Sequence, residues 1–97
     1  MKVKYLCSGN FNNGITNNSV VRLENTNGND TVVIQFDNQG NSGDMTLQGR
    51  VSADAPWVTV TTDATGSIQL VVAVTEYRVR INNTTGGVAE YNCWIGG

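Results

Sequence analysis

The chain of 97 residues carries a formal net charge of −2, only 14% of its residues are charged, and its composition, rich in asparagine, threonine, serine and glycine, is typical of an all-β protein with many turns. One domain, 1–97, with a single hydrophobic core fits this length. The six basic residues are scattered, which argues against nucleic acid as a partner, and no histidine is present to act as a general base or metal ligand.

The first segment, 2–7, alternates apolar and polar residues and predicts a short strand. No apolar run suited to a signal peptide precedes it, and no transmembrane segment follows, so we expect synthesis in a cytosol and no membrane partner. Residues 8–18 hold two glycines and five asparagines, which predicts an irregular contact loop. Within it, Phe11 and Ile15 either anchor the loop on its own domain or, with Asn12 and Asn13, dock on a partner.

Two strands, 19–24 and 31–36, flank a polar turn in which Asn27-Gly28 is the strongest two-residue hairpin signal of the chain. The pair therefore predicts a β-hairpin. In its second strand, the inward-facing residues are expected to be Val32, Ile34 and Phe36.

A turn at 37–43 leads into a strand at 44–52, whose expected inner face is Met45, Leu47, Gly49 and Val51. Glycine in the middle of a strand indicates a bulge or a large neighbour above it, and Trp57 is the expected neighbour. Beyond Pro56, which cannot donate a backbone hydrogen bond, residues 57–61 predict another strand.

Residues 67–74 predict a strand in which Ile68, Leu70, Val72 and Val74 share one face. Val71 lies on the opposite face, which indicates a strand covered on both sides.

Residues 76–95 are the best-specified part of the chain, and they predict a hairpin of two antiparallel strands around a glycine-containing loop. The inward-facing residues expected from the alternation are Tyr77, Val79, Ile81, Ala89, Tyr91, Cys93 and Ile95. Trp94 is out of phase with them and is either a lid on a sheet edge or an exposed aromatic anchor. About eight strands result, which predicts an all-β fold: an antiparallel β-sandwich of jelly-roll-like type.

Cys7 and Cys93 lie near the two ends of the chain, where the terminal strands of a sandwich often pair. A disulfide is one interpretation. Two buried thiols are the other, which synthesis in a reducing compartment favours.

No arrangement of residues resembles an active site, so we expect no enzyme activity, no cofactor and no metal. The eight carboxylates mostly flank turns, where aspartate caps backbone amides. Calcium binding by the oxygen-rich turns 25–30 and 37–44 is the alternative, although neither has the spacing of an EF-hand loop. Arg78 and Arg80 form either a positive stripe or pairs with Glu76 and Glu90.

Three segments carry a resemblance: GDMTLQGRVSADAPWVTV at 43–60, YRVRI at 77–81 and NTTGGV at 83–88. Their order resembles a β-sandwich module of tailed-bacteriophage virion proteins, over about residues 31–95. In that module a strand rich in threonine, leucine and glutamine precedes a Trp-Val strand, and a Y-R-V-R strand precedes a Thr/Ser-Gly turn. The chain departs from the module in its ending, Cys93-Trp94-Ile95, and in its asparagine-rich early segment.

The resemblance implies a virion structural protein, best a capsid decoration or cement protein on the outside of a phage head. Its implied partners are the major capsid protein and further copies of the same chain, often as a trimer. A receptor- or carbohydrate-binding module of a phage fibre is the alternative, based on Trp57, Tyr91 and Trp94 beside amide-rich loops.

Overall fold

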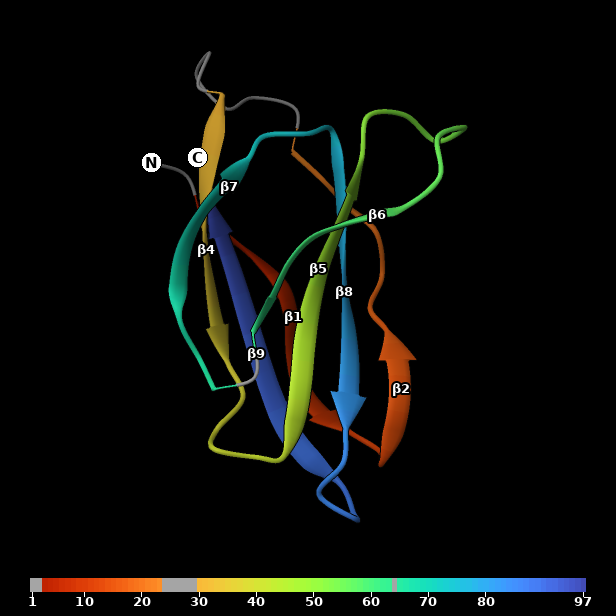
Figure 1. The fold of residues 1–97 in the computed structure, drawn as a ribbon, viewed down its shortest axis with the longest axis vertical. Helices are drawn as coiled ribbons and strands as arrows, with labels where there is room; N and C mark the ends of the chain where they lie inside the picture. The colour runs from red at the N-terminus through yellow and green to blue at the C-terminus, as the bar shows by residue number, and fades with distance from the viewer. Residues whose placement is uncertain (1–2, 24–29, 64) are drawn as a thin grey trace.

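The computed structural model describes residues 3–23, 30–63 and 65–97, and these residues form two antiparallel β-sheets without any helix (Figure 1). The predicted all-β antiparallel sandwich is confirmed. Nine strands occur in the described residues, in the order β1 (Val3–Phe11), β2 (Gly14–Asn17), β3 (Val21–Arg22), β4 (Thr31–Asp37), β5 (Gly43–Arg50), β6 (Val58–Asp63), β7 (Ile68–Val72), β8 (Glu76–Asn83) and β9 (Ala89–Gly96).

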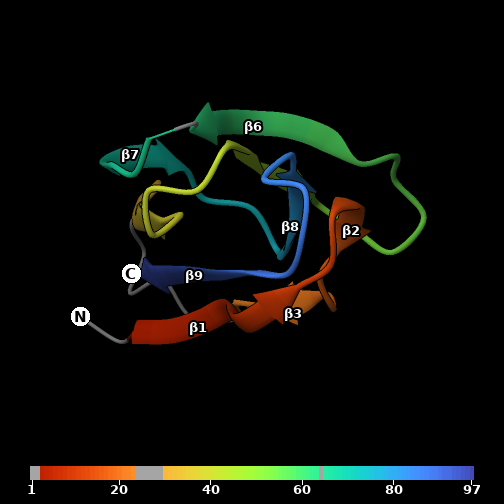
Figure 2. The ribbon, with the colours of Figure 1, turned by 90° about the horizontal axis from the view of Figure 1, so that it is seen from below.

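One sheet, here called sheet A, has the strand order β1-β9-β4-β7. The other, sheet B, has the order β2-β8-β5-β6, and the short β3 continues the β2 edge by pairing with the start of β8. Figure 2, which looks along the strands, shows the two layers and the place where edge strands β6 and β7 lie side by side. The described part of the chain contains no helix long and apolar enough to cross a membrane.

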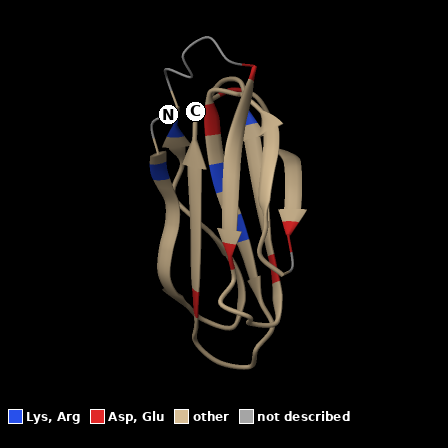
Figure 3. Cartoon of the chain, turned by 90° about the vertical axis from the view of Figure 1, so that its left-hand side faces the viewer, with Lys and Arg blue, Asp and Glu red and all other residues tan. Residues whose placement is uncertain are grey.

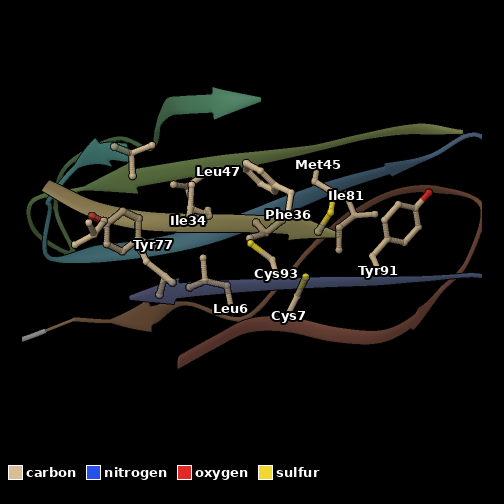
Figure 4. Close-up of a cluster of buried hydrophobic side chains, with 14 of the residues drawn as sticks. Leu6, Cys7, Ile34, Phe36, Met45, Leu47, Tyr77, Ile81, Tyr91 and Cys93 are labelled. Atoms are coloured by element: carbon tan, nitrogen blue, oxygen red, sulfur yellow. The ribbon is translucent and has the colours of Figure 1, made fainter. Parts of the chain in front are cut away.

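The core lies between the sheets and is built mainly by β4, β5, β8 and β9, whose apolar residues alternate with polar ones. Figure 4 shows these side chains pointing toward each other from both layers. The predicted inward residues of β4 and of β8 and β9 are buried, which confirms the two-residue period there. The buried apolar residues are Leu6, Cys7, Val32, Ile34, Phe36, Met45, Leu47, Val71, Tyr77, Val79, Ile81, Ala89, Tyr91, Cys93 and Ile95.

Both predicted hairpins are wrong in their pairing. β8 pairs with β2, β3 and β5, whereas β9 pairs with β1 and β4, so the loop between β8 and β9 crosses from sheet B to sheet A. In the same way β3 belongs to sheet B and β4 to sheet A; the Asn27-Gly28 turn itself lies outside the described residues. Alternation shows which side chains are buried, but it is equally consistent with a partner in the same sheet or in the facing one.

The predicted irregular loop at 8–18 is instead mostly strand. β1 continues to Phe11, opposite Ala89 of β9, and β2 pairs with β8, so that only residues 12 and 13 form the turn. These are edge strands with one side in solvent, and their polar residues are satisfied by backbone pairing and water rather than by a buried face.

A bulge in β1 between Tyr5 and Cys7 places both Leu6 and Cys7 in the core. Cys7 then lies directly opposite Cys93 of β9, and both are free, buried thiols. The buried-thiol interpretation is therefore the one that the structure bears out.

Gly49 has a different neighbour from the one expected. A methyl group at this position would lie 2.7 Å from Cγ2 of Val74 and 3.1 Å from Cγ2 of Val60. Trp57 lies elsewhere, over the outer face of sheet B, and Val51 falls beyond the end of β5 with its side chain 68% exposed. The glycine is thus needed because two valines close over it.

β7 is covered on one face only, and not on both faces as was expected. Val71 is the buried residue, opposite Val32 of β4, while the side chains of Ile68, Leu70 and Val72 are exposed on the outer face of sheet A. The strand is an edge strand, so only one of its faces meets the core.

Candidate interaction site

Three chain connections meet at the lower end of the molecule in Figure 1, and two of them, residues 11–15 and 84–88, form what we call the tip surface. Phe11 is half-buried and meets the ring of Tyr91 edge-on, with ring centroids 6.1 Å apart, so it anchors the turn on its own domain. Ile15, opposite Asn82 on the outer face of sheet B, is 59% exposed. Asn12 and Asn13 are exposed beside it, and Val88 adds a second exposed aliphatic side chain.

Asn83 fixes the tip surface, and sequence reasoning missed it. Its buried amide donates to the carbonyl oxygens of Phe11 (3.0 Å) and Gly87 (2.8 Å), and its Oδ1 accepts from the backbone amide of Thr85 (3.0 Å). The Oδ1 of Asn13 accepts from the backbone amide of Gly86 (3.0 Å). The two connections are therefore joined by hydrogen bonds, part-buried ones from Asn83 and an exposed one to Asn13, which restrict their motion. The signal in the sequence was an asparagine just before a Thr-Thr-Gly-Gly turn.

The third connection, 37–43, is tied to the same end. The hydroxyl of Tyr91 donates to the carbonyl oxygen of Ser42 (3.0 Å). The side-chain amide of Asn41 donates to the backbone carbonyl oxygen of Glu90 (3.0 Å). Inside the turn, Asp37 accepts from the backbone amide of Gln39 (3.1 Å), as expected of an aspartate at a turn. The side-chain oxygens of this turn thus serve the turn itself. The other oxygen-rich turn, 25–30, lies largely outside the described residues.

The fifth candidate contact residue, Trp94, is not part of the tip surface. It lies half-buried on the outer face of sheet A, against the exposed ring of Tyr5 at a centroid distance of 5.4 Å. Trp94 is on the central strand β9, so it is not a lid on a sheet edge.

The residues around Trp94 form a second surface, the apolar face, which covers all four strands of sheet A. Directly opposed residues of antiparallel strands share a face. Tyr5, Trp94, Gln35 and Ile68 form one row across the sheet; Val3, Gly96, Val33 and Leu70 form the next, and Val72 lies beyond them opposite Thr31. Of these, Ile68, Leu70 and Val72 were expected to share one face of a strand covered on both sides, because composition does not distinguish an exposed apolar row from a covered one.

The outer face of sheet B is built from charged side chains. The guanidinium groups of Arg50 and Arg78 lie 4.2 Å and 4.6 Å from the centroid of the Trp57 ring. The carboxylate of Glu76, 8% exposed, accepts from Nε of Arg50 at 2.9 Å and lies 3.5 Å from Nη2 of Arg22. The predicted pairing of Glu76 with Arg78 or Arg80 is corrected, since Arg78 donates instead to Oε1 of Gln48 (2.7 Å).

A groove of about 460 Å³ opens beside β6 and the end of β7. Its lining is largely aliphatic and includes Val51, Pro56, Val58, Val72 and Val74. Val72 joins this groove to the apolar face.

Ionisable groups inside the sandwich are held in their neutral forms. Burial raises the pKa of the Cys7 thiol to about 12 and raises the pKa of Cys93 further, with a contribution from the neighbouring Cys7. Burial also raises the pKa of Tyr77, whose hydroxyl donates to the Val72 carbonyl oxygen (2.9 Å). Within residues 3–23, 30–63 and 65–97, no group of three or more His, Cys, Asp or Glu side chains is placed to hold a metal ion.

Compared with protein families, with curated proteins and with solved structures, this chain matches none.

Proposed function

We propose that this protein is a capsid decoration protein, which binds the outer surface of a tailed-phage head and stabilises it without catalysing a reaction. The tip surface carries the proposal. It presents Ile15 and Val88 to solvent among exposed amides and hydroxyls, on turns that Asn83 holds in place. The choice of a capsid as partner comes from the resemblance of segments 43–60, 77–81 and 83–88 to the virion module.

The tip surface is suited to binding a preassembled lattice. Its two turns are joined before any partner arrives, so little conformational entropy is lost when they are covered. The exposed aliphatic side chains supply the apolar contacts, and Asn12 and Asn13 supply hydrogen bonds at the rim. Binding to assembled capsid protein in preference to free subunits then stabilises the shell by mass action. Major capsid protein is the proposed partner, together with further copies of this chain.

The test is to mix the purified protein with undecorated phage heads and to measure bound protein after sedimentation. We expect saturable, stoichiometric binding, and we expect Ile15→Glu to weaken it strongly because a charge would be buried at the contact. Val58→Glu is the matched control, since Val58 is equally exposed on β6 but is not part of the tip surface. Wild-type protein that stays free of heads at micromolar concentrations would refute the proposal.

Carbohydrate binding by a fibre module is the second hypothesis, and the structure changes its basis. Tyr91 is fully buried, and the ring of Trp57 contacts the guanidinium groups of Arg50 and Arg78, whereas Trp94 lies beside the exposed Tyr5 on the outer face of sheet A. A glycan array with wild-type protein and Trp94→Ala separates this hypothesis from decoration, which predicts no glycan signal.

A further inference from the structure

The apolar face of sheet A has the anatomy of a protein interface. Its exposed aliphatic and aromatic side chains, with the half-buried Val33 and Trp94, are contiguous across four strands. Charges on this side lie toward the strand ends, as Figure 3 shows for the strands nearest the viewer. Asp37 and Glu90 occupy the far end of the outer face, beside Asn10 and Asn92. An apolar centre with a polar border distinguishes a contact surface from scattered exposed residues.

We propose that the apolar face binds the same face of a second copy of this chain, so that two sheets A pack together in a symmetric dimer. The inference does not depend on capsid binding. The face is self-complementary about a two-fold axis that lies in the interface and runs along the strands. This axis exchanges β1 with β7 and β9 with β4, so that Tyr5 of one copy lies on Ile68 of the other and Trp94 lies on Gln35. In the next row, Val3 of one copy lies on Leu70 of the other.

The arrangement also gives the polar residue within the face a role. Gln35 lies between Trp94 and Ile68, on a strand next to the middle of the sheet. Near the axis, its amide faces Trp94 of the second copy, whose indole N–H can donate to the amide oxygen. No charged side chain of the described residues lies within the two rows, so the copies do not repel each other at the centre.

The area of the face fits a weak dimer. Four strands about 4.8 Å apart and five to nine residues long cover about 450 Å² in projection. Two copies then bury about 900 Å², which is in the range of weak, transient interfaces. We therefore expect dissociation in the micromolar range rather than an obligate dimer.

Packing of faces explains more of the structure than pairing of edges does. Phe36 N donates to Ser67 O, and Ala73 N donates to Asp30 O, which fixes the hydrogen-bonding pattern between β4 and β7. In this pattern the backbone N–H and C=O groups of Ile68, Leu70 and Val72 point away from β4, toward the open side of β7. A second β7 strand could pair there. Such a dimer would leave Tyr5 and Trp94 exposed on the far half of the sheet, whereas packing of faces covers both halves.

Sedimentation equilibrium over micromolar to near-millimolar concentrations tests the dimer. We expect wild-type protein to approach twice its monomer mass and Leu70→Glu to weaken association about tenfold or more. Ile15→Glu is the matched control, an exposed aliphatic residue on an edge strand of the other sheet, and it should dimerise normally. Circular dichroism verifies that both variants are folded. A wild-type monomer, a trimer, or a dimer indifferent to Leu70→Glu overturns the inference.

The fluorescence of Trp94 separates packing of faces from pairing of edges. In a Trp57→Phe background, Trp94 is the single tryptophan of the chain. Its emission should shift to shorter wavelength, and quenching by acrylamide should decrease, as the dimer forms. A dimer that forms without any change at Trp94 contradicts the proposed face. Loss of head binding by Leu70→Glu in a chain that is always monomeric would assign the face to the capsid instead and would also overturn the dimer.

Discussion

The outer faces of the two sheets differ in chemistry: sheet B carries charged side chains that contact one another, and sheet A carries exposed apolar side chains. On sheet B, the guanidinium groups of Arg50 and Arg78 contact the ring of Trp57, and Glu76 pairs with Arg50 and Arg22, so these side chains have their contacts within the chain. On sheet A, aliphatic and aromatic side chains are left in solvent across four strands. The contrast teaches that the charged side chains of sheet B contact one another within the chain, while sheet A leaves apolar area exposed in the monomer.

The largest effect is expected from Glu76→Gln. Removing its charge leaves Arg50, only 18% exposed, without its ionic partner, and we expect a loss of roughly 2 to 3 kcal/mol in the free energy of unfolding. Urea denaturation measures it. Glu90→Gln, at an exposed position opposite Asn10, should change stability by less than about 0.5 kcal/mol. Equal midpoints for the two variants would contradict a stabilising role of the sheet B charges.

Gly49→Ala tests how closely the inner side of sheet B is filled. The added methyl group would overlap with Val74 and crowd Val60, and we expect a loss of roughly 1 to 2 kcal/mol. The control is Gly87→Ala on the tip surface, where a methyl group meets no atom within 4 Å. A stable Gly49→Ala variant would show that the two valines move apart at little cost.

Alkaline pH should lower the free energy of unfolding through Cys7 and Cys93, which lie beneath the apolar face. The folded state holds the proton on Cys7 up to about pH 12, whereas the unfolded thiol releases it near its ordinary pKa of 9.0. The unfolded state is therefore favoured as pH rises through this window, by about 1.4 kcal/mol for one thiol near pH 10. Urea midpoints at pH 8 and 10 should differ less in Cys7→Ala than in the wild type. If the two proteins show the same difference in midpoint, a group other than Cys7 causes the loss of stability at alkaline pH.

The smallest effect on unfolding is expected from Leu70→Lys. The side chain is 73% exposed in the monomer, so its replacement should change the free energy of unfolding by less than about 0.5 kcal/mol. Measurement at a dilution where the protein is monomeric is required, because association adds stability at higher concentration. A loss of several kcal/mol would mean that Leu70 is a core residue of the monomer and that the contrast between the two faces is false.

The strands that could be predicted are those with a buried face. Alternation located β4, β8 and β9 because their inner residues must be apolar and their outer residues polar. It failed for β7, whose exposed row is more apolar than its buried one, and for 8–18, which form edge strands without a continuous buried row. Pairing could not be predicted, since a glycine-rich loop serves equally as a hairpin turn and as a crossing between sheets.

Of the five candidate contact residues, the sequence placed four in one segment, and the structure keeps them together with Phe11 as the anchor. It could not show that Trp94 lies elsewhere with Tyr5, because their proximity depends on β1 pairing with β9 from opposite ends of the chain. Asn83 escaped notice for the same reason, as its partner Phe11 is 72 positions away.

The position of β9 determines when this chain can fold. It is the last strand along the sequence, yet it lies inside sheet A, where β1 and β4 pair on either side of it. During synthesis, β4 can pair with β7, but β1 has no partner in that sheet until β9 has left the ribosome. A chaperone that shields apolar segments would be needed longest at this stage. Closing such distant pairings is slow, so refolding in milliseconds to seconds is expected rather than in microseconds.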